Sequence, residues 1–192
     1  TSRKTSPTLP MIIADQLRQK NRAEYLLYLW QVEDIIRAYS GDIDRLKQEY
    51  LSRFEVDDSR RQAMYQWYAD LCEMMRSEGC MQGGHLRLSL NVLDTLDDLH
   101  RHLLRSSRFP YYREMYYKVL PYVVELRQKG GHKDQSELQT CFEALYGVMM
   151  LRMQHKPVSD STAQAAKDIA TLLGQLSDYY FKDQAEPINF DD

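Results

Sequence analysis

The chain has 192 residues, of which 43% are hydrophobic and 28% are charged, and its formal net charge is −3. A chain of this length can bury a core large enough to fold without metal or disulfide bonds. The small negative charge excludes a general attraction to nucleic acid or anionic membranes, and the longest apolar run, Tyr25–Trp30, is far too short to span a bilayer. We therefore expect a soluble protein with no membrane partner.

The cysteines indicate a reducing compartment. Their number is odd, and Cys72, Cys80 and Cys141 all fall in or beside helical patterns, so a disulfide framework is not expected. No secretory leader with a basic start and an apolar middle is visible. These features predict a cytoplasmic protein.

The two ends of the sequence differ from its middle. Residues 1–10 carry Ser, Thr, Pro and basic residues without apolar periodicity, and they are expected to form a disordered leader or a tag remnant. Residues 183–192 are acidic and contain Pro187, which predicts a tail. The stretch between them, residues 11–182, is predicted to form one helical domain.

Within that stretch, apolar residues recur with the i, i+3, i+4, i+7 spacing of one helix face. The clearest example comprises Tyr25, Tyr28, Leu29, Val32, Ile35, Ile36 and Tyr39. Asn21 and Glu24 have the spacing of a capping box at the start of this helix. Gly41 suits its end, and Asp42 suits the N-cap of the next helix, which is expected to reach about Phe54.

The later helices are predicted from similar signals. Their expected N-terminal residues are Ser59, Asn91, Pro110, Ser136 and Ser161. Pro121 lies inside the pattern that begins at Pro110, where we expect a kink or a restart. No segment alternates apolar and polar residues for long enough to predict a sheet. The predicted fold is all-α, a single-domain helical bundle of about six or seven helices.

A first candidate site is a group of carboxylates among the aromatic residues of the helix after Asn21. A buried carboxylate must be paired or hydrogen-bonded, and Arg37, Arg76 or Arg127 could be the partner. One interpretation is a pocket for a cationic or hydroxylated ligand, and the other, which we favour, is an internal salt bridge that fixes the helices. The candidate pocket residues are Glu24, Glu33, Asp34, Arg37 and Arg127.

A second candidate is a metal site in the segment Asp97–His102. Asp97 and His100 share a helix face at i, i+3, and Asp98 and His102 share one at i, i+4. Helical di-iron proteins use a similar Glu-x-x-His spacing, but they need a second copy on a facing helix, and no other histidine follows a carboxylate at that spacing. We favour a polar helix face and predict no metal or cofactor.

A third candidate is a basic and aromatic segment, residues 101–118. Arginines beside aromatic rings can hold single-stranded nucleic acid by phosphate contact and base stacking. Core spacing of some tyrosines and the acidity of the chain argue against this use, so nucleic acid is not the expected partner. The candidate residues are Arg101, Arg105, Arg108, Tyr111, Arg113, Tyr117 and Lys118.

Several segments together resemble an uncharacterised family of unknown function from Bacteroidetes. They are Met11–Ala14, Glu24–Asp34, Asn91–Leu93 followed by Leu99 and His100, Val124–Arg127, and Cys141–Val148. The resemblance covers residue 11 to about residue 182. It implies an all-helical cytoplasmic protein, and it implies no activity or ligand.

No catalytic residue is predicted, because no nucleophile is accompanied by an identifiable base. The 14 tyrosines and 9 methionines instead favour a non-catalytic protein that binds an unknown protein partner or itself, for example as a dimer. The alternatives are a small-molecule or metal-dependent enzyme that uses the carboxylates and histidines above, and nucleic-acid binding through residues 101–118.

Overall fold

The computed structural model describes residues 8–130 and 134–191 of the chain. Over these ranges all regular secondary structure is helical, which confirms the predicted all-α class. The count in the described part is eight α-helices, more than the six or seven expected. One reason is that α1 (Pro10–Lys20) and α2 (Arg22–Ala38) are separate helices, since Asn21 between them is extended, with φ −151° and ψ 97°.

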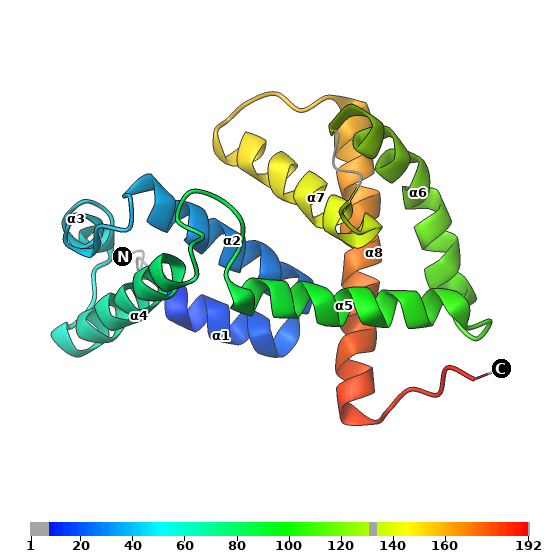
Figure 1. Ribbon diagram of the computed structural model, residues 1–192, viewed down its shortest axis with the longest axis horizontal. Helices are drawn as coiled ribbons and strands as arrows, with labels where there is room; N and C mark the ends of the chain where they lie inside the picture. Colours follow the sequence, from blue (N-terminus) through cyan, green and yellow to red (C-terminus); the bar gives the residue numbers. More distant parts are fainter. Residues whose placement is uncertain (1–7, 131–133, 192) are drawn as a thin grey trace, which may run out of the picture. The chain divides into compact units, whose positions relative to one another are not determined.

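The chain order can be followed in Figure 1. After α2 come α3 (Ile43–Glu49), a short 3-10 turn η1 (Leu51–Arg53), α4 (Asp58–Ser77), α5 (Arg87–Arg105), α6 (Pro110–Gly130), α7 (Glu137–Met153) and α8 (Asp160–Ala185). In the described ranges no helix is both long enough and apolar enough to cross a membrane.

Backbone contacts divide the chain into two compact units, with the boundary between Asn91 and Val92. Helix α5 crosses this boundary without a break, so no linker separates the units. Whether residues 11–182 behave as one domain stays a prediction. Of the predicted leader, residues 1–7 lie outside the described residues, whereas Leu9 is buried and Pro10 begins α1. Helix α8 continues to Ala185, into the predicted acidic tail.

In the first unit, α1 packs on α2, and α4 packs on both α1 and α3. The core between them contains Val32 and Ile36 from α2 together with Met64, Tyr68 and Met75 from α4, all of them buried. In α2 these residues follow the predicted apolar spacing. The same helix therefore carries its polar residues Glu33 and Arg37 beside the core rather than away from it.

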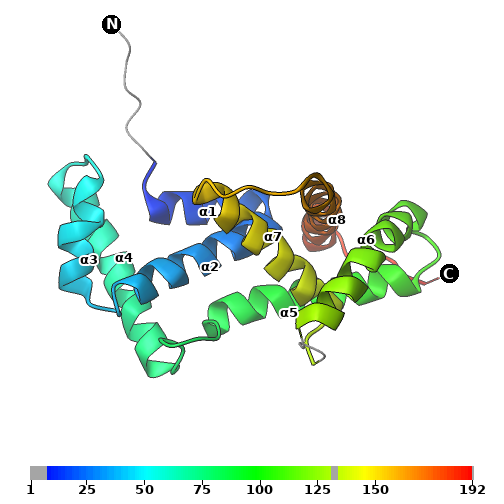
Figure 2. The ribbon, with the colours of Figure 1, turned by 90° about the horizontal axis from the view of Figure 1, so that it is seen from above.

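In the second unit, α6, α7 and α8 pack on one another, and Figure 2 shows α8 nearly end-on beside α6. The buried face of α6 carries Tyr112, Tyr116, Val119 and Val123. The helix is continuous through Pro121, so the predicted restart at this residue is absent. Pro121 is exposed, on the side of α6 away from the buried residues.

The helix ends test the capping predictions residue by residue. The side chains of Asn21, Asp42 and Ser136 each accept backbone N–H bonds at the start of their helices, as predicted. Helices α4 and α8 begin slightly earlier than expected: Asp57 rather than Ser59 caps α4, and Ser159 rather than Ser161 caps α8. The prediction for Asn91 is wrong, because this residue lies inside α5, which begins at Arg87. The reason for that early start lies in a contact with α2.

Candidate functional site

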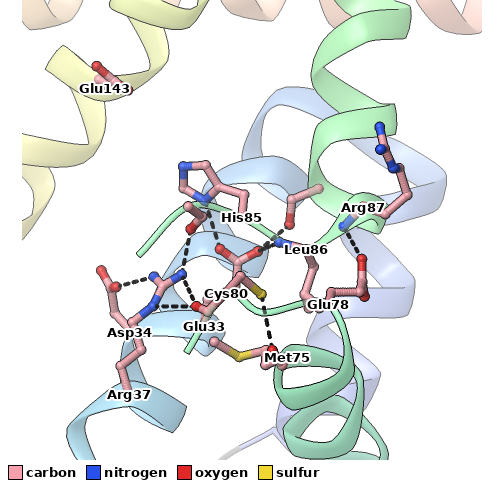
Figure 3. Close-up of polar contacts among 12 residues, drawn as sticks. Glu33, Asp34, Arg37, Met75, Glu78, Cys80, His85, Leu86, Arg87 and Glu143 are labelled. Carbon is pink, nitrogen blue, oxygen red and sulfur yellow. Dashed lines mark hydrogen bonds and ion pairs between the residues drawn. The ribbon is translucent and has the colours of Figure 1, made fainter. Parts of the chain in front are cut away.

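Glu33 is the central residue of the polar cluster in the first unit (Figure 3). It lies on α2, and its side chain is fully buried. Its Oε1 accepts hydrogen bonds from the Leu86 backbone N–H at 3.1 Å and from the Ser89 hydroxyl at 2.6 Å, and its Oε2 accepts from His85 Nδ1 at 2.8 Å. The carboxylate thus sits at the N-terminus of α5, where the helix dipole favours negative charge. Glu33 therefore caps a helix that begins more than fifty residues later in the chain.

Arg37, one turn further along α2, binds the loop that precedes α5. Its Nη2 donates to the carbonyl oxygens of Cys80, at 3.0 Å, and Gly84, while its Nη1 pairs with Asp34 at 2.9 Å. At the other end of the loop, the Glu78 carboxylate accepts from the Arg87 N–H at 2.7 Å. The start of α5 is therefore held by two carboxylates, and the loop before it by one guanidinium.

His85 contacts the cluster both by ring stacking and by a hydrogen bond. Its ring stacks on Trp30 with centroids 4.4 Å apart and an angle of 14° between the ring planes, and its Nδ1 meets the buried carboxylate. A carboxylate so placed fixes the orientation of the imidazole ring. The neighbouring Cys80 thiol bonds to the Met75 carbonyl, and burial raises the pKa of this thiol, which disfavours the nucleophilic thiolate.

The structure brings together only some of the candidate pocket residues. Glu33, Asp34 and Arg37 lie close together, and the ion pair of this group is Asp34–Arg37. Glu24 is exposed at the start of α2, and the contacts described for Arg127 are with the Gln135 carbonyl and Glu137, both in the second unit.

Sequence reasoning did not identify His85 and Ser89 as partners of Glu33. They are 52 and 56 residues from it in the chain, so no local spacing relates them. A cavity of about 700 Å³ lies elsewhere in the first unit. It is lined by Thr8, Leu9, Ile12, Glu55, Val56, Asp57, Arg60 and Arg61.

A second polar cluster lies in the core of the second unit around His100. Its Nδ1 hydrogen-bonds the Tyr112 hydroxyl, and its ring packs edge-on against Tyr116. The Tyr116 hydroxyl in turn donates to Glu137. Burial lowers the pKa of His100 to about 4, an effect that Arg101 reinforces and Glu137 opposes. The imidazole is therefore neutral near pH 7 and part of the packed core.

The candidate metal ligands do not converge. His100 is buried, whereas His102 is exposed and bonds through Nδ1 to the Asp98 carbonyl at 2.7 Å. Burial also raises the pKa of Asp97, which disfavours its charged, metal-binding form. Across the described part of the chain, no three His, Cys, Asp or Glu side chains are grouped to hold a metal ion.

In the basic segment, most of the cations contact acidic groups or backbone carbonyls. Arg101 lies 3.8 Å from Asp97 and 3.7 Å from Asp98, Lys118 lies 3.5 Å from Asp168, and Arg113 donates to the carbonyls of Leu104 and Ser106. Arg108 contacts the C-terminal residues, and Arg105 is exposed at the end of α5. Tyr111 and Tyr117 are exposed, but they are six positions apart on α6 and so do not form one stacking face.

Comparison with known proteins adds a family but no activity. No curated protein and no solved structure gave a significant match to the chain. A family model described as "Domain of unknown function (DUF4924)" matches residues 11–187. This span includes every described helix but the first residue of α1. The chain therefore belongs to the DUF4924 family, whose domain has no assigned function.

Proposed function

We propose that this protein is a non-catalytic helical protein that associates with a second copy of itself through an exposed face of α6. The observation that carries the proposal is a row of apolar residues, Tyr117, Pro121 and Val124, which we call the α6 row. Tyr117 is 60% exposed and Val124 is 47% exposed. Their i, i+4, i+7 spacing aligns them on one side of the helix, opposite the buried face. Single exposed apolar residues are ordinary, whereas an aligned row with an aromatic residue is typical of an interface core.

A second copy fits this row because of its symmetry. In a two-fold dimer the same patch meets itself. A two-fold axis near Pro121 with antiparallel α6 helices would place Tyr117 of one copy against Val124 of the other. It would also bring Lys118 near Glu125 of the other copy, and both residues are exposed. Opposite charges at the rim favour this register over a parallel one.

The two polar clusters support a structural rather than a catalytic role for their buried polar side chains. Glu33 uses its carboxylate to cap α5, and His100 is neutral within the core. The enzyme alternative has Glu33 and His85 as its best-placed groups. The cytoplasmic location and the Bacteroidetes origin implied by the resemblance belong to the same proposal, and the three free, buried cysteines support a reducing compartment.

The mass of the full chain in solution tests the proposal. Light scattering coupled to size-exclusion chromatography, at micromolar protein, should give the mass of a dimer. Val124→Lys introduces a charge opposite Tyr117 of the other copy and should raise the dissociation constant of the dimer at least about tenfold. Tyr111→Lys is the matched control, because Tyr111 is on the same helix and 80% exposed but is outside the α6 row.

Two results would contradict the assignment. The first is a wild-type protein that stays monomeric up to about 100 μM, because a dimer with a micromolar dissociation constant would form at that concentration. Equal dissociation of the Val124→Lys and Tyr111→Lys proteins would place the contact elsewhere. Circular dichroism of both variants checks that α-helix content is retained.

A further inference from the structure

The last residues of the chain pack back against the second unit. Figures 1 and 2 show the segment after α8 running toward the corner between α5 and α6. We call residues 187–191 the C-terminal tail. Ile188 and Phe190 are half-buried, whereas Pro187, Asn189 and Asp191 are exposed. This alternation is that of an extended segment with one side pressed on a surface.

The main contact is aromatic. The Phe190 ring centroid lies 5.3 Å from that of His102 and 5.8 Å from that of Phe109. Phe109 is itself held edge-on by Tyr179 of α8, with centroids 5.3 Å apart. These distances are within the range of favourable ring contacts. We call His102, Arg108 and Phe109 the tail surface.

Arg108 supplies the polar contact. Its Nη1 donates to the backbone carbonyls of Asn189 and Asp191, both at 3.4 Å. Carbonyl contacts recognise an extended backbone without reading side chains, so Phe190 is the residue that gives this contact its specificity. The long distances and the exposure of Arg108 make the bonds weak. An exposed tail held in this way is released easily.

The corner itself is built without the tail. Arg113 donates to the Leu104 carbonyl at 2.9 Å and to the Ser106 carbonyl at 2.7 Å, and the Ser106 hydroxyl accepts from the Arg108 N–H at 3.2 Å. These bonds fix the turn between α5 and α6. Because these bonds do not involve the tail, we expect the tail surface to keep its shape when the tail leaves, and a preformed surface lowers the cost of binding another segment.

We propose that the tail surface is a peptide-binding site for an extended segment of a partner protein that places an aromatic side chain against His102 and Phe109 and its backbone carbonyls at Arg108. The protein's own Phe190–Asp191 occupies the site in the absence of the partner. The tail defines the chemistry of that occupant: an aromatic ring for His102 and Phe109, and backbone carbonyls for Arg108. The site is separate from the α6 row, so this proposal does not depend on self-association.

The short connection between α8 and the tail sets how strongly the tail competes with a free peptide for the tail surface. The tail begins within a few residues of the end of α8, and a short flexible linker gives an effective concentration of millimolar order. A free peptide with the same contacts therefore binds poorly while the tail is in place. Removing the Phe190 ring should allow the free peptide to bind the tail surface.

The experiment uses the full chain and a synthetic peptide of residues 183–192, added up to millimolar concentration and followed by NMR shifts of the ¹⁵N-labelled protein. The Phe190→Ala protein should bind this peptide about tenfold more tightly than the wild type does, because the competing tail is lost. A peptide that itself carries Phe190→Ala should bind neither protein. Adding Arg108→Ala to the Phe190→Ala protein should weaken binding, whereas Arg105→Ala, at the neighbouring exposed arginine, should not.

Three outcomes would overturn the proposal. One is equal affinity, or no binding, for the wild-type and Phe190→Ala proteins. Another is binding of the Phe190→Ala peptide as tightly as the native peptide. The third is a dimer that Phe190→Ala converts to monomer, because the occupant would then be the tail of a second copy rather than a partner. If Val124→Lys dissociates the dimer and Phe190→Ala does not, the result tests the proposed self-association through the α6 row and leaves the peptide-binding proposal unaffected.

Discussion

His100 shows how much the surroundings of one residue change its chemistry. On sequence spacing it was a candidate metal ligand with Asp97. In the structure it is buried beside Tyr112 and Tyr116, and its pKa is lowered to about 4, mainly because burial disfavours the charged imidazole. In its neutral form His100 packs as a core residue, and its hydrogen bond to the Tyr112 hydroxyl satisfies a buried polar group.

This burial predicts a loss of stability in acid. The unfolded chain binds a proton at His100 near pH 6.5 and the folded chain only near pH 4. The unfolded state therefore gains protons as the pH falls through this window, and the free energy of unfolding decreases. The expected loss from His100 is about 2 kcal/mol between pH 7 and pH 5. Urea titrations at the two pH values measure it.

Two variants separate His100 from other acid effects. His100→Gln keeps a neutral hydrogen-bonding side chain, so it should remove most of the difference between the two pH values. His102→Gln changes an exposed histidine two positions away and should leave that difference unchanged. If the pH dependence is the same in His100→Gln as in the wild type, the imidazole of His100 is protonated as readily in the folded protein as in the unfolded one.

At the scale of elements, the start of α5 depends on residues that are far from it in the sequence. Its sequence offers no residue that accepts its first N–H groups, which is why Asn91, four positions inside the helix, was the predicted cap. The groups are instead satisfied by Glu33 from α2 and by Glu78 from the end of α4. Helix ends need such partners, whichever part of the chain supplies them.

Removing the Glu33 carboxylate should therefore be costly. Glu33→Ala leaves the Leu86 N–H, the Ser89 hydroxyl and the His85 ring without their buried acceptor. We expect a loss of roughly 3 kcal/mol in the free energy of unfolding. Asp34→Ala, at the exposed neighbouring carboxylate, should cost at most about 1 kcal/mol. The midpoints of urea unfolding, followed by circular dichroism, compare the two. Similar costs would mean that the cap does not stabilise α5.

At the scale of the whole molecule, the question is whether the two compact units unfold together. The first unit contains Cys72 and Cys80, and the second contains Cys141. All three thiols are buried, and burial raises their pKa values, that of Cys141 to about 12. A buried thiol reacts only when the structure around it opens. The cysteines are therefore natural probes of both units.

We expect the native protein at pH 8 to react slowly with a thiol reagent and all three cysteines to react quickly in guanidinium chloride. Because α5 runs through both units, Cys72 and Cys141 should become reactive at the same denaturant concentration, as in one cooperative domain. Mass spectrometry of the labelled peptides identifies which cysteine has reacted. Labelling of one of them at a clearly lower concentration would instead identify two units that unfold independently.

The sequence by itself determined the helical class and most helix positions. Apolar spacing and the caps at Asn21, Asp42 and Ser136 act over three or four residues, so they can be read directly. The candidate site was predicted only in part. Glu33 and Arg37 were named, but His85 and Ser89 were not.

Only the tertiary structure decided which groups meet across long separations. Glu33 and Leu86 are 53 residues apart, and Arg108 and Asn189 are 81 residues apart. The identity of such partners depends on how the helices pack, and packing is set by the summed contacts of many side chains rather than by a local spacing. For the same reason, the sequence showed that a buried carboxylate needs a partner, and the packing of α2 against the loop before α5 determined that the partner is a helix end.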